Sequence, residues 1–244
     1  MLFALLMLPT KCTQEPYFLM EINQKMSMIS RSIDKILEFL YGDKKAELLS
    51  EISFVKYAYQ NFVSIMQYPE QRTATIQSLQ EARKTAIKDI EFYLGDLYST
   101  VREKSTDDIS ATVDKAFQIH QCLELSMQLY MATNLLEVYY SQNYDTDYLR
   151  GIENDAKIYI SKYEKQVLGD FNALEMALIG YKPPKLGKKV DTAPLLERTN
   201  SVIDFLTNTE ENEMKKQFHA GLYSAERPVE YCICGDGSLY LRKA

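Results

Sequence analysis

The chain has 244 residues, of which 46% are hydrophobic and 25% are charged, and its formal net charge is -6. This composition is typical of a folded globular protein, and the net negative charge argues against general nucleic-acid binding, which needs a surplus of Lys and Arg on one face. Only 9 Gly and 7 Pro occur in the whole length, too few turn residues for a many-stranded β protein of this size, so the composition favours long helices.

The first eight residues, Met1 to Leu8, are all apolar and are followed by Pro9. Eight residues are too few to cross a bilayer, which takes about 20. A secretory signal also fits poorly, because no basic residue precedes the run and no small-residue cleavage site follows it. Two interpretations stay open: this end packs into the core, or it continues a longer hydrophobic segment upstream.

From Leu19 to Leu40, apolar residues recur at alternating steps of three and four, which predicts a helix that lies along another helix in a narrow seam. Gly42 and Asp43 then predict a break and a restart. A second helix is expected over about 44–68 with a matching stripe, so the two helices should form a hairpin. The candidate interaction seam consists of Ile22, Met26, Ile29, Ile33, Ile36, Leu40, Leu48, Ile52, Val55 and Tyr59.

Pro69 is well placed near the start of a third helix over about 70–103, whose apolar stripe is interrupted by Arg83. We expect Arg83 to reach solvent by extending its side chain along the surface. The N-cap residues at 105–108 open a fourth helix that reaches about Ser141. Its apolar face is unusually wide, which predicts that it lies at the centre of the bundle.

A fifth helix should begin at a cap formed by Asp145 or Asp147 and run to about Gly180. Helices of this length would be roughly 40 to 50 Å long, so the body should be elongated. The pattern is typical of a mainly α fold, an antiparallel bundle of long, coiled-coil-like helices that occupies residues 1–180.

Residues 181–194 carry Lys182, Lys185, Lys188 and Lys189 among prolines and a glycine, which predicts a solvated basic linker. A C-terminal unit, 195–244, should then hold two short helices, over about 193–207 and 210–223, and a β-hairpin. The hairpin strands flank Gly235-Asp236-Gly237, a sequence suited to a tight turn. Such a hairpin must pack on helices, pair with another strand or dimerise to be stable.

The residues that carry chemistry form no recognisable set. No phosphate-binding glycine motif is present. Of the two histidines, His120 and His219, His120 is predicted to be an interior or flank residue of the fourth helix rather than a catalytic base. Cys232 and Cys234 are spaced as C-x-C, but zinc sites normally need two further nearby ligands. We therefore predict no enzyme activity, no catalytic residues, no metal and no cofactor, and we infer no small-molecule ligand.

Two functional hypotheses follow, from different classes. The first is a non-enzymatic helical scaffold or protein-protein interaction module, which binds a protein partner or self-associates through the candidate interaction seam. The second is a membrane-active, pore-forming-like helical protein, or the soluble part of one, with the apolar N-terminus as its membrane contact. The widely spaced cysteines favour the cytoplasm, and a membrane-peripheral location is the alternative.

Overall fold

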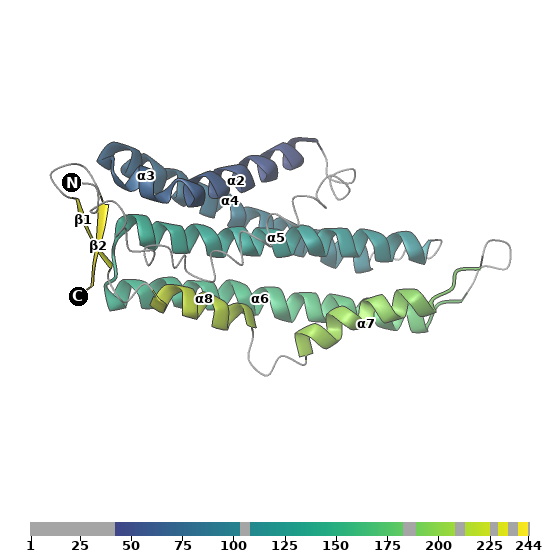
Figure 1. The fold of residues 1–244 in the computed structure, drawn as a ribbon. Helices are drawn as coiled ribbons and strands as arrows, with labels where there is room; N and C mark the ends of the chain where they lie inside the picture. The colour runs from purple at the N-terminus through teal and green to yellow at the C-terminus, as the bar shows by residue number, and fades with distance from the viewer. Residues whose placement is uncertain are drawn as a thin grey trace, which may run out of the picture.

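A computed structural model of the chain describes residues 42–102, 108–182, 189–207, 213–224, 229–233 and 239–243. Its elements in chain order are α2 (Gly42–Gln60), α3 (Phe62–Met66), α4 (Pro69–Arg102), α5 (Ile109–Ser141), α6 (Thr146–Ile179), α7 (Ala193–Thr207), α8 (Glu213–Ser224), β1 (Val229–Ile233) and β2 (Leu239–Lys243). The described part is mainly helical and packs as a bundle, which confirms the predicted fold class at that level (Figure 1).

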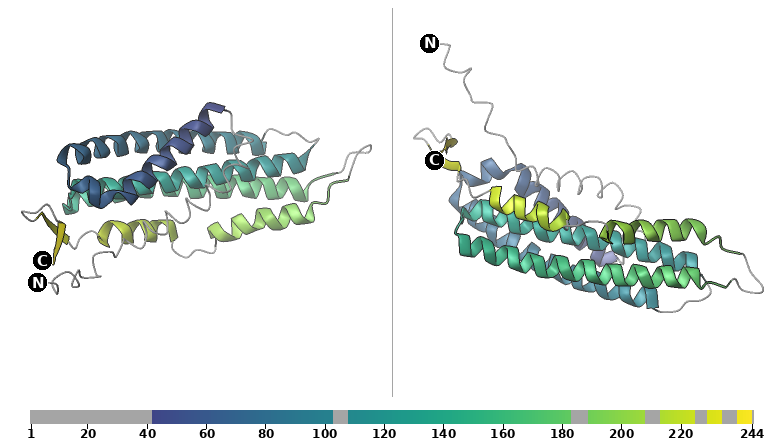
Figure 2. Two further views of the ribbon diagram at one scale, coloured as in Figure 1. Left: turned by 45° about the horizontal axis from the view of Figure 1, so that its top comes forward. Right: turned by 90° about the horizontal axis from the view of Figure 1, so that it is seen from below.

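Three helices of 34, 33 and 34 residues, α4, α5 and α6, form the body of the protein. At 1.5 Å per residue each is about 50 Å long. Successive helices are antiparallel, so α4 and α6 run in the same direction, and each of the three helices contacts the other two (Figures 1 and 2).

The helix ends follow local capping chemistry. The Asp108 carboxylate accepts a hydrogen bond from the Ala111 N–H at 3.0 Å, and the Asp145 carboxylate accepts from the N–H groups of Asp147 and Tyr148. Both side chains satisfy backbone donors that have no partner within the helix. Gln142 ends α5 in a left-handed conformation with φ 55°. Asp145, not Asp147, is therefore the cap of α6.

The sequence predicted one helix over about 44–68, whereas the structure has α2 and α3 with a break at Asn61. The Asn61 side chain donates a hydrogen bond to the Tyr57 carbonyl at 3.0 Å. The Asn61 backbone N–H donates to the same carbonyl at 3.0 Å, so helix-type bonding continues across the break.

The core is centred on α5, as its wide apolar face predicted. Most of its residues are buried, including the unbroken run 129–138. Its most extensive interface is with α4. Small buried side chains on these two helices include Ala86 of α4 and Ala116 and Ala132 of α5.

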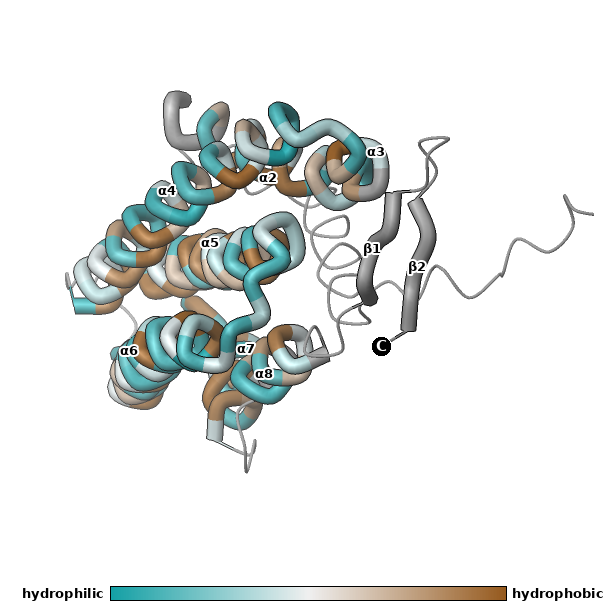
Figure 3. Tube along the Cα trace, turned by 90° about the vertical axis from the view of Figure 1, so that its left-hand side faces the viewer, coloured by the Kyte–Doolittle hydropathy of each residue, from teal (hydrophilic) through white to brown (hydrophobic). Residues whose placement is uncertain are grey.

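Two outer layers cover the body. Figure 3, which looks along the long helices, shows α2 and α3 on one side of α5 and α7 and α8 beside α6. Adjacent tyrosines in the last turn of α5 join both layers: the Tyr140 hydroxyl donates to the Ala58 carbonyl of α2 at 2.6 Å, and the Tyr139 hydroxyl donates to the Gly221 carbonyl of α8 at 3.2 Å.

The short helices agree with the sequence in position: α7 has the predicted bounds, and α8 begins three residues later than expected. Both contact α6, and Phe218 and Leu222 of α8 are buried in the common core. The division of the chain at 181–194 stays a prediction, since residues 183–188 lie outside the described part.

At the C-terminus, β1 and β2 pair antiparallel with Val229 opposite Lys243 and Ile233 opposite Leu239. The turn residues 235–237 and the strand side chains lie outside the described residues. The hairpin as an element that packs on the protein therefore stays a prediction.

Candidate functional site

The candidate interaction seam falls partly within the described residues. Leu48, Ile52 and Val55 of α2 are buried, and Tyr59 is half-buried against the core. They recur at steps of four, three and four, which places them on one side of α2, the side that packs on α4 and α5. The remaining seam residues lie outside the described part: Ile22, Met26, Ile29, Ile33, Ile36 and Leu40.

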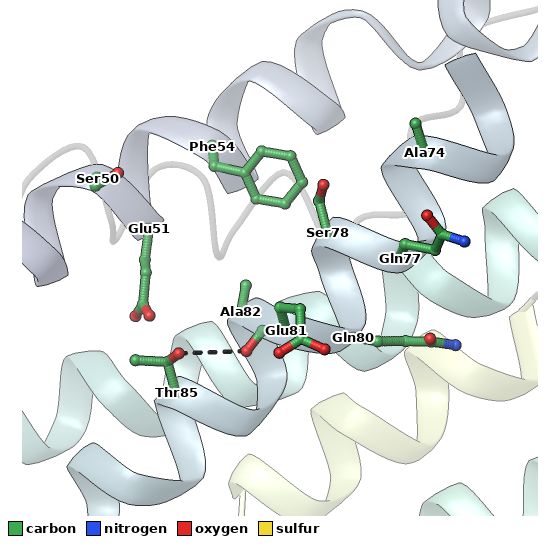
Figure 4. A pocket seen from close by; sticks show the side chains of 10 residues that line it. All are labelled: Ser50, Glu51, Phe54, Ala74, Gln77, Ser78, Gln80, Glu81, Ala82 and Thr85. Atoms are coloured by element: carbon green, nitrogen blue, oxygen red, sulfur yellow. Dashed lines mark hydrogen bonds between the residues drawn. The ribbon is translucent and has the colours of Figure 1, made fainter. Parts of the chain in front are cut away.

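An open groove lies between α2 and α4, with a volume of about 660 Å³ (Figure 4). Small side chains, Ser50, Ala74 and Ser78, leave the space, and Phe54 projects into it. The charged lining residues are the carboxylates Glu51 and Glu81. The remaining lining residues are polar or small: Gln77, Gln80, Ala82 and Thr85.

Arg83 keeps part of its side chain in solvent, as expected, with 28% of it exposed. Its guanidinium also pairs with Glu137 of α5 (Nη1 to Oε2, 2.7 Å) and donates to Asn134 Oδ1 at 3.1 Å, which the sequence did not predict. Gln80 donates to the other Glu137 oxygen at 2.8 Å. A buried carboxylate is costly unless its acceptor sites are occupied, and here both oxygens are. This cluster aligns α4 with α5.

His120 lies in the interior, as expected. Its Nε2 is 3.1 Å from the Tyr163 hydroxyl of α6, and its ring meets the edge of Phe171. Burial lowers the pKa of His120 to about 4, so the ring is neutral near pH 7. Burial also raises the pKa of the Cys122 thiol to about 12, with the charges of Asp89 and Asp96 adding to the effect. A protonated thiol is a poor nucleophile.

A second polar cluster joins α6 to α8 around the Glu153 carboxylate. It accepts hydrogen bonds from Lys157 Nζ at 2.6 Å, His219 Nδ1 at 3.0 Å and the Tyr223 hydroxyl at 3.0 Å. Burial favours the protonated carboxyl, but the three donors outweigh it and bring the pKa of Glu153 down to about 2. The side chain of His219 is 56% exposed, so the cluster lies at the edge of the bundle.

Polar contacts also set the register between α4 and α6. Lys162 pairs with Glu91, Arg102 pairs with Asp170, and Gln166 donates to the Leu94 carbonyl at 2.8 Å. Burial raises the pKa of Asp170, and Arg102 counteracts this shift. Every one of these contacts links residues of two helices, which is a structural role.

One of these clusters is partly visible in the sequence. Arg83 interrupts an apolar stripe, and Glu137 is a single charge within the apolar stretch 127–140. Two opposite charges on otherwise apolar faces point to a buried pair. Glu153 gave no comparable signal, because its partners lie on α8.

Within the described ranges, no group of three or more His, Cys, Asp or Glu residues is arranged to hold a metal ion. The side chains of Cys232 and Cys234 are outside those ranges. In the same part of the chain, no helix combines the length and apolar character needed to cross a bilayer. The apolar run Met1 to Leu8, on which the membrane-active hypothesis rests, is also outside.

Comparison of the chain with protein-family models, with curated proteins and with solved structures gives no match.

Proposed function

We propose that the protein is a non-enzymatic helical scaffold that associates through exposed helix surfaces with a protein partner or with a second copy of itself. The observation that carries the proposal concerns α2. Its seam residues Leu48, Ile52 and Val55 are buried in the core that α2 shares with α4 and α5. These residues are therefore not a free surface, and we propose that the predicted stripe of Leu19–Leu40 is covered by a partner or by a second copy.

The interior of the bundle supports the same function. Its charged and polar side chains, such as Arg83 with Glu137 and Glu153 with His219, bind one another across helix interfaces. Groups held in this way fix the positions of the helices, as a rigid scaffold requires.

The test is sedimentation velocity of the full chain over a concentration series, with Ile29→Asp and Ser30→Asp compared. Ile29 lies on the predicted stripe and Ser30 lies off it, so both variants add the same charge at neighbouring positions. We expect a species heavier than the monomer that Ile29→Asp dissociates and Ser30→Asp leaves intact. If the chain is monomeric, the same variants serve as baits for partner proteins, and equal capture by both would refute the proposal.

A further inference from the structure

The outward face of α6 is exposed although it carries large apolar side chains. Ile158 is 64% exposed and Met176 is 66% exposed. The other sides of α6 face α4, α5, α7 and α8, and Figure 3 shows α6 at the edge of the bundle. The exposed residues recur at steps of three and four, which places them in one line along the helix. We define this line as the α6 face: Gly151, Asp155, Ile158, Lys162, Lys165, Gly169, Asn172 and Met176.

Two glycines on the α6 face are not explained by packing within the chain. A Cβ atom added at Gly151 or at Gly169 would meet nothing within 4 Å. Glycine in a helix interior costs about 1 kcal/mol relative to alanine. Open space above both glycines allows the backbone of a second helix to approach closely.

The charges on the α6 face are arranged symmetrically. Asp155 and Lys165 form no ion pair with another residue in the part of the chain that the structure describes. The point midway between them along α6 is also midway between Gly151 and Gly169. If a second α6 packs antiparallel across this point, Asp155 faces Lys165 of the second copy and Gly151 faces its Gly169.

The same axis pairs the remaining central positions. Ile158 then faces Lys162 of the second copy, whose aliphatic stem can cover the Ile158 side chain while its ammonium group stays with Glu91. Opposite charges meet twice, because a two-fold axis repeats each contact. The part of the α6 face from Gly151 to Gly169 is therefore complementary to itself in charge, and Asn172 and Met176 extend beyond the paired positions at each end of the contact.

We infer that two copies of the chain pack antiparallel through the α6 face about a two-fold axis near its centre. The inference rests on the interaction role proposed above and assigns a surface to self-association that is separate from the stripe of Leu19–Leu40. An antiparallel helix pair with small residues at the contact points is the expected geometry.

The experiment mixes two charge variants, Asp155→Lys and Lys165→Asp. Each variant alone places like charges opposite each other twice in the dimer, so each should dimerise about tenfold more weakly or worse. In a mixture of the two, every facing pair is again opposite in charge, so the heterodimer should form. Glu197→Lys on the exposed side of α7 is the matched control and should leave dimerisation unchanged. Sedimentation velocity at low ionic strength measures the mass, and circular dichroism confirms that each variant is folded.

The measurement is made in the full chain and again with Ile29→Asp present, which separates the two surfaces. A dimer that persists with Ile29→Asp and responds to the charge variants supports the α6 face. A chain that is monomeric with Ile29→Asp, or charge variants that dimerise as tightly as the parent protein, overturns it while leaving the proposed function to its own test.

Gly169→Leu provides a second test, because it separates an effect on dimerisation from an effect on the stability of the fold. A leucine fits the open space and favours helix, so the variant should be at least as stable against urea as the parent protein. It should nevertheless dimerise at least tenfold more weakly, because the backbones can no longer approach. Unchanged dimerisation would overturn the inference.

Discussion

Helices α5 and α7 both carry many apolar residues, but the bundle surrounds α5 and covers only one side of α7. Most residues of α5 are buried, whereas Thr199 is the buried residue of α7. The apolar side chains of α7 that face the core, such as Leu196 and Val202, remain half-buried. Because α7 buries so little surface, it should contribute less to the free energy of unfolding than α5, and its local unfolding should need less free energy.

The largest expected difference comes from truncating one leucine in each region. Leu135→Ala in α5 should lower the free energy of unfolding by about 2 to 5 kcal/mol, because the site is closed on all sides and a cavity remains. Leu196→Ala in α7 should cost less than about 1.5 kcal/mol, since solvent already reaches that side chain. Urea unfolding followed by circular dichroism measures both. Equal losses would show that the two regions are equally well packed.

A second difference concerns acid. The pKa of His120 is 6.5 in an unfolded chain and about 4 in the fold, so below pH 6.5 the unfolded state binds more protons and the fold loses stability. The loss from this group should reach about 3 kcal/mol by pH 4, at 1.36 kcal/mol per pKa unit. His120→Gln should flatten the unfolding free energy between pH 6.5 and 4. A profile that kept its slope would contradict a neutral, buried ring.

A smaller and more local effect is expected at the outer layer. The pKa of Glu153 is lowered from 4.5 to about 2, so its contribution is present above pH 4.5 and is lost as the pH falls towards 2. Glu153→Gln should cost about 1 to 2 kcal/mol at pH 7, since only part of the cluster is shielded from solvent. Amide hydrogen exchange should accelerate in α8 and not in α5, while Glu197→Gln on α7 should change neither. Faster exchange in α5 would place Glu153 in the core rather than at its edge.

Much of this architecture could be predicted from local patterns. The period of three to four and the caps at Asp108 and Asp145 define the long helices, and the wide face of α5 places it at the centre. The break at Asn61 could not be predicted, because no proline or glycine marks it. The contacts of Glu153 with α8 join residues 66 and 70 positions apart, and they depend on a register between helices that no local pattern sets.

The candidate site shows the same limit. The apolar stripe of α2 follows from its periodicity. Periodicity does not tell whether such a stripe packs on the same chain or on another one. In the structure, Leu48, Ile52 and Val55 are buried in the core of their own chain. The residues left exposed on α6 were visible only as apolar positions outside the predicted buried stripe. The exposure of Ile158 and Met176 depends on which sides of α6 the neighbouring helices cover, and the sequence does not show this.

The paired tyrosines at the end of α5 have a mechanical consequence for the outer layers. Tyr139 and Tyr140 are consecutive, yet one holds α8 and the other holds α2. Unwinding that single turn would release both hydroxyls together, so the two layers on opposite sides of the protein would lose an anchor in the same event. Motion at this end of α5 would therefore affect α2 and α8 together, although these two helices do not need to contact each other.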